Sequence, residues 1–328
     1  MTGPDHIELQ EVPEPDADGA MVRVASVGIC GTDFKIVAGK IAVEYPRVIG
    51  HELVGEVVAA PAGADARVGA TVLVDPGITC GTCVQCRSGR GNICTGGWLL
   101  GRDRDGGLEE LIQLPAANLY PLPEGIDPAE APLLQVLATC VHGQRLAPVL
   151  PGTPVVVIGM GVTGLLHLQL AKRAGAVPIV CTTRSDEKLL LAAELGADVT
   201  VAADGHDAEE QIVEATGGSA DLVIDCVGSV ATLATAVHVA RIGGRILSYG
   251  TISQTDGNLP YYQLYYKELV VSHPRSANAE DFPLAIDAVT RGHVRLAPLV
   301  SERFPLSAVR DAIDAGQRSG ALKVLVDL

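Results

Sequence analysis

Aromatic side chains and positive charges are both scarce in this 328-residue chain. It has three Phe, one Trp and seven Tyr, and 24 Lys and Arg stand against 39 Asp and Glu, for a formal net charge of -15. A nucleic acid or an anionic membrane would need a basic face that this balance does not supply, so we expect neither as a partner. The few aromatics argue against a large apolar pocket and favour a small polar molecule.

Long apolar runs and a basic leader are absent as well. No segment reaches the roughly 18 to 20 uninterrupted apolar residues of a membrane-spanning helix, and residues 5–14 carry four acids where a signal peptide would be basic. Four of the eight cysteines lie within residues 80–94 and the others are scattered, which is typical of reduced thiols and metal binding and not of a disulfide framework. We therefore expect a cytoplasmic protein without a membrane segment.

The hydrophobic pattern changes about 130 residues into the chain. The first part predicts short strands between Gly and Pro residues, as in a mostly β domain. Later strands alternate with helical patterns, which is typical of a parallel sheet covered by helices. The predicted strands are Met21–Val27, Glu52–Ala60, Thr71–Val74, Val155–Ile158, Pro178–Cys181, Leu222–Cys226, Arg245–Tyr249 and Leu322–Val326. The length allows two hydrophobic cores, and the sequence predicts an α/β protein of two domains.

Four cysteines follow the pattern C-x2-C-x2-C-x7-C among several glycines. They are Cys80, Cys83, Cys86 and Cys94. Four thiolates saturate a tetrahedral Zn²⁺, which makes such a site structural, with no open position for chemistry. An iron–sulfur cluster and unligated thiols are the alternatives. Because no redox partner motif accompanies the cysteines, the sequence favours structural zinc.

A glycine-rich turn directly follows the strand Val155–Ile158 and opens a helical pattern over Leu165–Ala174. Its residues are Gly159, Met160, Gly161, Val162, Thr163 and Gly164. In this G-x-G-x-x-G order the first glycine permits the tight turn, the second lets the backbone approach a pyrophosphate, and the third lets the helix pack on the strand. The first helical amides would face the phosphates. The strand–turn–helix context predicts dinucleotide binding over a merely structural turn.

The next strand ends at Thr183, Arg184 and Ser185, where an NAD-binding protein would carry Asp or Glu for the ribose 2′-hydroxyl. A carboxylate would repel a 2′-phosphate. Thr183 and Ser185 can donate hydrogen bonds to that phosphate, and Arg184 can meet it with a charged fork. The sequence therefore favours NADP over NAD. The alternative is that Arg184 is a solvated loop cation and that either cofactor is accepted.

Two further segments carry groups that bind metals or protons. They comprise Cys30, Thr32 and Asp33 after one predicted strand, and His51 and Glu52 at the start of another. Neither is persuasive alone, because a buried Cys is usually packing and a single His is usually structural. Together with the cysteine pattern, the glycine turn and the stretch Gly106-Gly-Leu-Glu-Glu, they make the chain resemble the zinc-containing medium-chain dehydrogenases. That family includes alcohol, sorbitol, threonine and glucose dehydrogenases, and the resemblance covers essentially the whole chain.

The resemblance implies roles for these residues. Cys30 and His51 would be ligands of a catalytic zinc, and Glu52 would be a third ligand or a carboxylate just behind it. Thr32 would take the alcohol proton, and Asp33 would orient His51. A zinc with three protein ligands keeps one position for substrate and stabilises an alkoxide, and hydride then passes to the nicotinamide ring.

Two positions depart from the commonest family pattern. Lys35 stands where many members carry the histidine that ends the proton relay, so the relay would run through this lysine or through solvent. Gln135 falls where polyol-type members usually have a glutamate that faces the zinc. Neither change removes a predicted metal ligand.

The family resemblance also implies an architecture. A Rossmann-type doubly wound parallel sheet at residues 136–275 would bind the dinucleotide, and a mostly β, GroES-like catalytic domain would comprise residues 1–135 and 276–328. A homodimer or homotetramer is expected, with residues 243–272 near a dimer interface. The tyrosines of residues 261–266 fit a subunit contact better than a substrate cleft.

The sequence thus predicts an oxidoreductase with two zinc ions per chain that transfers a hydride between a small alcohol and NADP(H). A polyol, sugar or amino alcohol is favoured as the substrate. Two alternatives remain at this point: a zinc-free quinone or enoyl reductase of the same superfamily, and a nucleotide-binding protein without catalysis. The combination of Cys30, Thr32, His51 and Glu52 argues against both.

Overall fold

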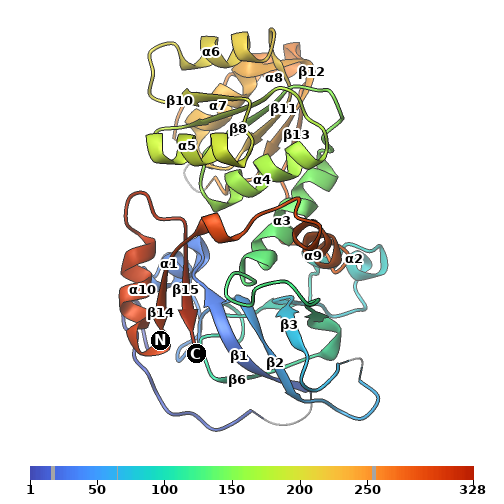
Figure 1. Ribbon diagram of the computed structural model, residues 1–328, viewed down its shortest axis with the longest axis vertical. Coiled ribbons are helices and arrows are strands. Elements are labelled where there is room, and N and C mark those ends of the chain that lie inside the picture. Colours follow the sequence, from blue (N-terminus) through green and yellow to red (C-terminus); the bar gives the residue numbers. More distant parts are fainter. Residues whose placement is uncertain (16–18, 65, 253–255) are drawn as a thin grey trace. The chain divides into compact units, whose positions relative to one another are not determined.

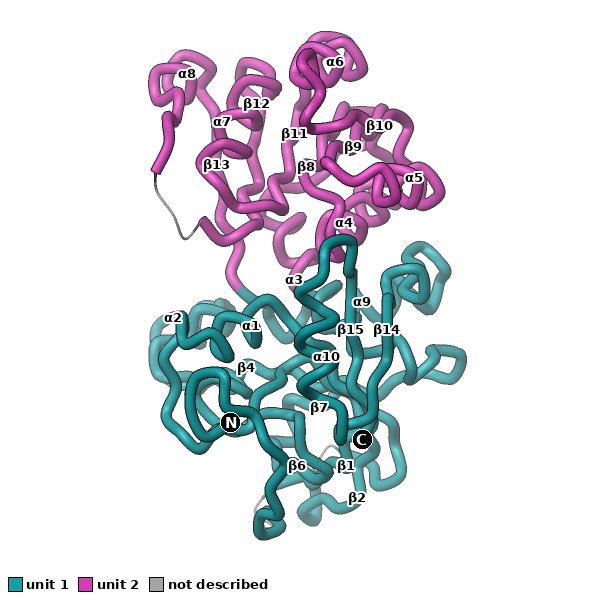
Figure 2. Tube along the Cα trace, turned by 90° about the vertical axis from the view of Figure 1, so that its left-hand side faces the viewer, with its two compact units in different colours: residues 1–138, 276–328 teal, residues 139–275 magenta. Residues whose placement is uncertain are grey.

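Two sheets of different kinds organise the chain. The structure is a computed structural model that describes residues 1–15, 19–64, 66–252 and 256–328. It divides into unit 1, which comprises Met1–Ala138 and Ser276–Leu328, and unit 2, which comprises Thr139–Arg275 (Figure 2).

Unit 1 is built on a seven-stranded sheet (Figure 1). Its strand order is β14-β15-β1-β2-β3-β7, and β6 pairs with β1 outside this path. The strands are β1 (Ala20–Gly28), β2 (Glu52–Ala59), β3 (Thr71–Val74), β6 (Leu111–Leu114), β7 (Leu119–Pro121), β14 (Val300–Pro305) and β15 (Lys323–Asp327). Buried β-branched and aliphatic side chains, among them Val22, Leu53 and Val72, form the core of this sheet.

The helices of unit 1 are short. They are α1 (Gly31–Val37), α2 (Val84–Arg87), α9 (Asp281–Thr290), α10 (Val309–Gly316) and the first part of α3 (Leu133–Leu146), and a small separate sheet pairs β4 (Gly77–Ile78) with β5 (Trp98–Leu99). Helices α1 and α10 share a second core with β15, in which Ile36, Ile313 and Val324 are buried. This core ties the C-terminal segment to the chain that follows β1.

The end of β1 brings three distant segments together. Gly28 pairs with Glu52 on β2 and with Leu325 on β15, and the next amide, Ile29 N–H, donates to the Val324 carbonyl at 3.0 Å. The residues after β1, at the start of β2 and at the start of β15 therefore become neighbours.

Unit 2 contains a six-stranded sheet in the order β10-β9-β8-β11-β12-β13, and every pair in it is parallel. Its strands are β8 (Val155–Ile158), β9 (Ile179–Thr183), β10 (Val199–Ala202), β11 (Ala220–Asp225), β12 (Ala240–Ser248) and β13 (Val270–Ser272). Its helices are α4 (Val162–Arg173), α5 (Asp186–Leu195), α6 (Ala208–Ala215), α7 (Val230–Val239) and α8 (Tyr261–Tyr266), with the rest of α3. They lie on both faces of the sheet (Figure 1).

The predicted fold class is confirmed, since a doubly wound parallel sheet accompanies a mostly β unit. The strand order of unit 2 reverses between β8 and β11, and open parallel sheets bind ligands outside the carboxyl ends of the strands at such a switch point. Each predicted strand overlaps an observed one. The largest difference is at β12, which begins at Ala240 where the sequence predicted Arg245, because Gly243 and Gly244 interrupt the apolar pattern.

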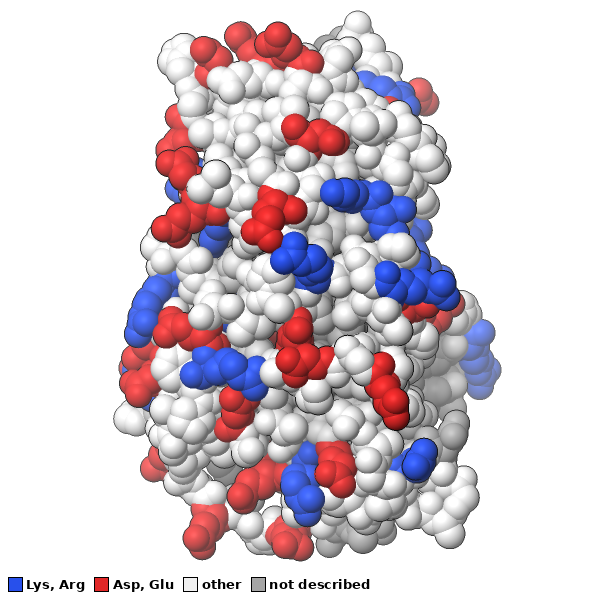
Figure 3. All heavy atoms as spheres, in the orientation of Figure 1, with Lys and Arg blue, Asp and Glu red and all other residues white. Residues whose placement is uncertain are grey.

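Charges of both signs are interspersed on the surface. Figure 3 shows Lys and Arg as well as Asp and Glu side chains on one face, with several of the basic side chains adjoining one another along its right-hand edge. Across the described residues, no helix combines the length and the apolar character needed to cross a membrane.

One largely buried carboxyl group in unit 1 links stability to pH. Asp75 directly follows β3, and one of its carboxylate oxygens accepts the Gly77 N–H at 2.8 Å. Burial raises the pKa of Asp75 to about 7, although the Gly77 hydrogen bond works in the opposite direction. The native state therefore keeps this proton over a pH range in which the unfolded chain, with a pKa near 3.9, loses it.

We expect Asp75→Asn to raise the melting temperature by about 2–4 °C at pH 8. The contribution of Asp75 to stability is fully present below pH 4 and is lost as pH rises toward 7, whereas the amide keeps an acceptor for Gly77 and never ionises. Differential scanning calorimetry of both proteins from pH 4.5 to 8 measures the effect. A gain that does not shrink as pH falls would contradict the assignment.

Candidate active site

The three predicted ligands of the catalytic zinc lie together in unit 1. Cys30 follows β1 at the N-terminal end of α1, and His51 and Glu52 stand at the start of β2. One potential ligand atom from each residue lies within 4.8 Å of those of the other two. His51 is 6% exposed and Glu52 is 2% exposed. Thiolate, imidazole and carboxylate are the ligand types of zinc sites with three protein ligands.

Asp33 contacts two of these residues, Cys30 and His51. One carboxylate oxygen accepts the Cys30 backbone N–H at 2.8 Å, and the other lies 3.5 Å from His51 Nδ1. Asp33 is fully buried. Burial lowers the pKa of His51, but the negative charge of Asp33, with a contribution from Cys30, outweighs this and raises that pKa well above its ordinary value. The electrostatic potential in the cluster is therefore negative, which favours a bound cation.

A lysine that sequence reasoning missed completes this cluster. Lys323, the first residue of β15, places Nζ 2.5 Å from Glu52 Oε2 and donates to the Ile29 carbonyl at 3.1 Å. Burial lowers the pKa of Lys323, yet the negative charge of Glu52, with contributions from Cys30 and Asp33, outweighs this and raises that pKa. A signal was present: in Leu322-Lys-Val-Leu-Val326 a charged residue interrupts an apolar strand pattern, and a buried lysine needs a partner.

The remaining predicted active-site residues lie on two helices. Thr32 and Lys35 are half-buried on α1. Gln135 is 8% exposed on α3, and its side chain makes no hydrogen bond to any residue that the structure describes. Their proposed roles in proton transfer and zinc binding stay predictions.

The four cysteines of the second predicted metal site converge in a loop of unit 1. Their sulfur atoms all lie within 4.8 Å of one another, with Cys94 Sγ 3.4 Å from Cys80 Sγ and 3.8 Å from Cys83 Sγ. A tetrahedral zinc with Zn–S bonds of about 2.3 Å requires sulfur separations of about 3.8 Å. A Cβ atom at Gly97 would lie only 2.5 Å from the Ile78 carbonyl oxygen and 3.2 Å from Cys94 Sγ. Glycine is therefore needed for this loop to close.

The acidities of these thiols also suit a metal. Hydrogen bonds from backbone amides, first that of Cys86, lower the pKa of Cys83 to about 5, and the Thr82 amide leads those that lower the pKa of Cys80 to about 7. Burial and the neighbouring thiols raise the pKa of Cys86 to about 11. Thiolates crowded in this way repel one another, and a dication between them removes that repulsion.

The glycine turn in unit 2 has the shape that a dinucleotide requires. Gly159 has φ = 91° and follows β8, and a Cβ atom on Gly164 would collide with the Gly159 carbonyl oxygen. At Gly161, the first residue before α4, a Cβ atom would meet nothing within 4 Å. Space is thus left free at the one glycine where the backbone should approach a pyrophosphate.

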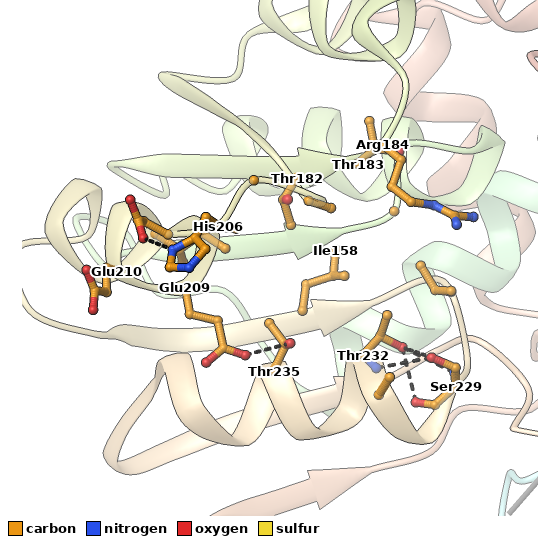
Figure 4. Close-up of a pocket in the computed structure, with 18 residues that line it drawn as sticks. Ile158, Thr182, Thr183, Arg184, His206, Glu209, Glu210, Ser229, Thr232 and Thr235 are labelled. Carbon is orange, nitrogen blue, oxygen red and sulfur yellow. Dashed lines mark hydrogen bonds and ion pairs between the residues drawn. The ribbon is translucent and has the colours of Figure 1, made fainter. Parts of the chain in front are cut away.

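A cavity of about 850 Å³ lies beside this turn, at the carboxyl ends of β8 and β9 (Figure 4). Thr183 and Arg184 line it, and Arg184 is the one Arg or Lys among its lining residues. Ser185 caps α5, where its hydroxyl accepts the Lys188 N–H at 3.4 Å. The region that sequence analysis assigned to the adenosine ribose therefore borders a real cavity.

The opposite wall of the cavity is acidic and was not predicted. Asp207, Glu209 and Glu210 line it, and Figure 4 shows the Arg184 guanidinium pointing away from Glu209 and Glu210. Glu209 is already engaged, since it accepts the Thr235 hydroxyl at 2.8 Å and lies 3.1 Å from His238 Nδ1. These acids lie about twenty residues beyond Arg184, so only the pairing of β9 with β10 brings them to the same cavity.

Two protein families match the chain. The alcohol dehydrogenase GroES-like domain matches residues 16–124, and the zinc-binding dehydrogenase family matches residues 162–291. The chain belongs to the zinc-dependent medium-chain alcohol dehydrogenases. The predicted family and the predicted enzyme class, an NAD(P)-dependent alcohol dehydrogenase, are thereby confirmed.

Relatives span nearly the whole dehydrogenase. It is 32% identical to L-galactonate-5-dehydrogenase of Escherichia coli K12, over 93% of this chain and 90% of that protein. It is 30% identical to sorbitol dehydrogenase of Bacillus subtilis 168, over 98% and 93%.

Solved structures are also similar to the chain over nearly its whole length. A zinc-binding dehydrogenase of Sinorhizobium meliloti 1021 bound to NADP is 34% identical, with a TM-score of 0.92 over 100% of this chain and 97% of that one. The rspB alcohol dehydrogenase of Escherichia coli CFT073 complexed with NADH is 31% identical, with a TM-score of 0.92 over 99% and 97%.

Proposed function

We propose that the dehydrogenase oxidises a small polyol, sugar-type or amino alcohol at a zinc held by Cys30, His51 and Glu52. The observation that carries this proposal is the convergence of these three side chains, with Asp33 behind His51. Zinc, when bound, acts as a Lewis acid on the alcohol oxygen. Asp33 would fix the ring orientation of His51, and Thr32 would accept the alcohol proton while its own hydroxyl proton passes on through Lys35 or solvent.

The two units divide the work in this proposal. Residues 1–135 and 276–328 form the catalytic domain, and residues 136–275 bind the dinucleotide through the turn of Gly159 to Gly164. The four-cysteine loop holds a second, structural zinc. We place the enzyme in the cytoplasm, where its eight free cysteines remain reduced.

The substrate class rests on chemistry and on relatives. Relatives include enzymes named for sorbitol, L-galactonate, L-idonate and L-threonine, and the chain has few aromatic side chains for a large apolar pocket. Initial rates of cofactor reduction with these four compounds, and with 1-hexanol as an apolar comparison, test the proposal. A clear preference for 1-hexanol would contradict it.

We propose NADP as the preferred cofactor. Arg184 is exposed beside the cavity and makes no ion pair with a described residue, so it is available for a 2′-phosphate. Solved relatives hold NADP in one case and NADH in another, and they do not decide the preference. The acidic wall of Asp207, Glu209 and Glu210 opposes a phosphate, which limits the preference that Arg184 can provide.

The wild-type enzyme should use NADP⁺ with a kcat/KM at least about tenfold higher than NAD⁺, because one charged contact contributes about 1.4 kcal/mol or more. Arg184→Ala should remove most of this difference by weakening NADP⁺ use alone. Lys188→Ala is a matched control, since it removes a positive charge that lies four residues further along the chain, in α5, and does not line the cavity. Steady-state kinetics with both cofactors measure the effect, and a wild-type preference for NAD⁺ would overturn the assignment.

We propose a homodimer or homotetramer with residues 243–272 near a dimer interface; of these, 253–255 lie outside the described residues. Strand β13 is an edge of the six-stranded sheet, and the four tyrosines of α8 are 58–80% exposed. Sedimentation equilibrium at micromolar concentration should give a mass of at least twice that of the chain, whereas a monomer would contradict this proposal.

A further inference from the structure

Glu52 and Lys323 form a buried ion pair next to two proposed metal ligands. Their side chains are 2% and 6% exposed, and Lys323 Nζ lies 2.5 Å from Glu52 Oε2. The ammonium also donates a hydrogen bond of 3.1 Å to the carbonyl of Ile29, the residue that directly precedes Cys30. The lysine is thus fixed at two points, and it engages one particular oxygen of Glu52.

The backbone at Gly28 makes room for this pair. Gly28 pairs with Glu52 across β1 and β2. A Cβ atom on Gly28 would collide with Glu52 Oε2 and would lie 3.3 Å from Lys323 Cδ. The absence of a side chain at Gly28 creates the space that both side chains occupy. Gly28 therefore provides the space in which Glu52 and Lys323 form their ion pair.

Two charge effects follow for a metal at this site. Cys30 as thiolate and Glu52 as carboxylate supply two negative charges, and Lys323 returns one positive charge within a hydrogen-bond length of Glu52. Because Oε2 already accepts a hydrogen bond from the ammonium, Oε1 is the oxygen of Glu52 with more acceptor capacity left for a metal. A carboxylate bound through both oxygens would occupy a coordination position that the substrate needs.

We propose that Lys323 is a positioning residue of the metal site: it holds Glu52 by Oε2, limits it to one oxygen toward the metal, and offsets its charge. This inference rests on the proposed function, in which Cys30, His51 and Glu52 hold the catalytic zinc. Lys323 acts through Glu52 and does not touch the substrate. Lys323 thereby leaves one coordination position of the metal for the substrate, and its positive charge keeps the ligands from fully neutralising the charge of the metal.

Lys323→Met tests this role, because it removes the ammonium but keeps most of the side-chain volume. The protein is loaded with Co²⁺ at both sites, and its visible spectrum is compared with that of the wild type. The four-cysteine site contributes equally to both and cancels in the difference. We expect the visible absorption bands of Co²⁺ at the site of Cys30, His51 and Glu52, the three-residue site, to lose about half their intensity or more. The reason is that Glu52 would then bind through both oxygens and raise the coordination number of the metal.

Metal affinity provides the second readout. In competition with a chelator, Lys323→Met should bind Zn²⁺ at the three-residue site at least about tenfold more tightly, since a positive charge next to a dication has been removed. Lys323→Arg keeps the charge and should stay within about threefold of the wild type. Lys267→Met is a matched control, because the Lys267 ammonium bonds three backbone carbonyls in unit 2, and both readouts should be unchanged.

A folded Lys323→Met protein with wild-type spectrum and affinity would overturn the proposal. If that variant does not fold, Gly28→Ala decides, since it keeps both charges but displaces the Glu52 carboxylate; a changed Co²⁺ spectrum supports the role and an unchanged one overturns it. Wild-type protein that binds metal only at the four cysteines would instead overturn the proposed function, and with it this role.

Discussion

Replacing His51 with Ala should lower kcat/KM for alcohol oxidation by at least about 10³-fold, because a Lewis-acid metal contributes several kcal/mol to catalysis and 1.36 kcal/mol corresponds to a factor of ten. His51 is one of three side chains whose ligand atoms converge within 4.8 Å, and a site left with two protein ligands should not retain its zinc. The zinc content should fall by one ion per chain.

The measurement combines steady-state kinetics with metal analysis of the same preparation, and circular dichroism establishes that the variant is folded. His293→Ala is the control, since His293 is exposed in the same unit and belongs to neither metal cluster. Zinc loss without loss of activity would show that the three-residue site is not the catalytic one.

Replacing Cys94 with Ser should lower the melting temperature by about 10 °C and remove the other zinc ion. Structural zinc contributes directly to folding free energy, and about 2–4 °C of melting temperature is lost per kcal/mol in a unit of this size. Cys94 lies centrally in the cluster, with two other sulfurs within 3.8 Å and the Cys80 amide donating to it at 3.3 Å. Below the melting transition, kcat/KM should stay within about threefold of the wild type.

Thr82→Ala is the matched control for this prediction. Thr82 lies in the same loop and its hydroxyl contacts Cys80 Sγ at 3.7 Å, but it is not a ligand, and its loss should shift the melting temperature by less than about 2 °C. Equal melting temperatures for the Cys94→Ser variant and the wild type would contradict a structural zinc. A loss of activity well below the transition would contradict its separation from catalysis.

Local patterns made the dinucleotide turn and the cysteine loop predictable. In both, the necessary residues lie within 15 positions of each other, and the glycines mark where a side chain cannot fit: Gly164 against the Gly159 carbonyl, and Gly97 against Ile78 and Cys94. The alternation of apolar strands with helical patterns likewise predicted the parallel sheet.

Contacts between segments that lie far apart in the sequence were harder to predict. Cys30 and His51 could be joined only through the family resemblance, because nothing local to either residue indicates the pairing of β1 with β2. Lys323 was missed altogether, since 271 residues separate it from Glu52. The acidic wall of the cofactor cavity was missed for the same reason: the chain folds Asp207 and Glu209 toward Arg184 only after β9 and β10 have paired.

Zinc content of the purified wild-type enzyme tests the central claim most directly. Mass-spectrometric metal analysis against protein concentration should give two zinc ions per chain, one for the cluster of Cys30, His51 and Glu52 and one for the four cysteines. A single zinc ion per chain, retained in His51→Ala and lost in Cys94→Ser, would leave the enzyme with a structural metal only. That result would contradict a zinc-dependent mechanism.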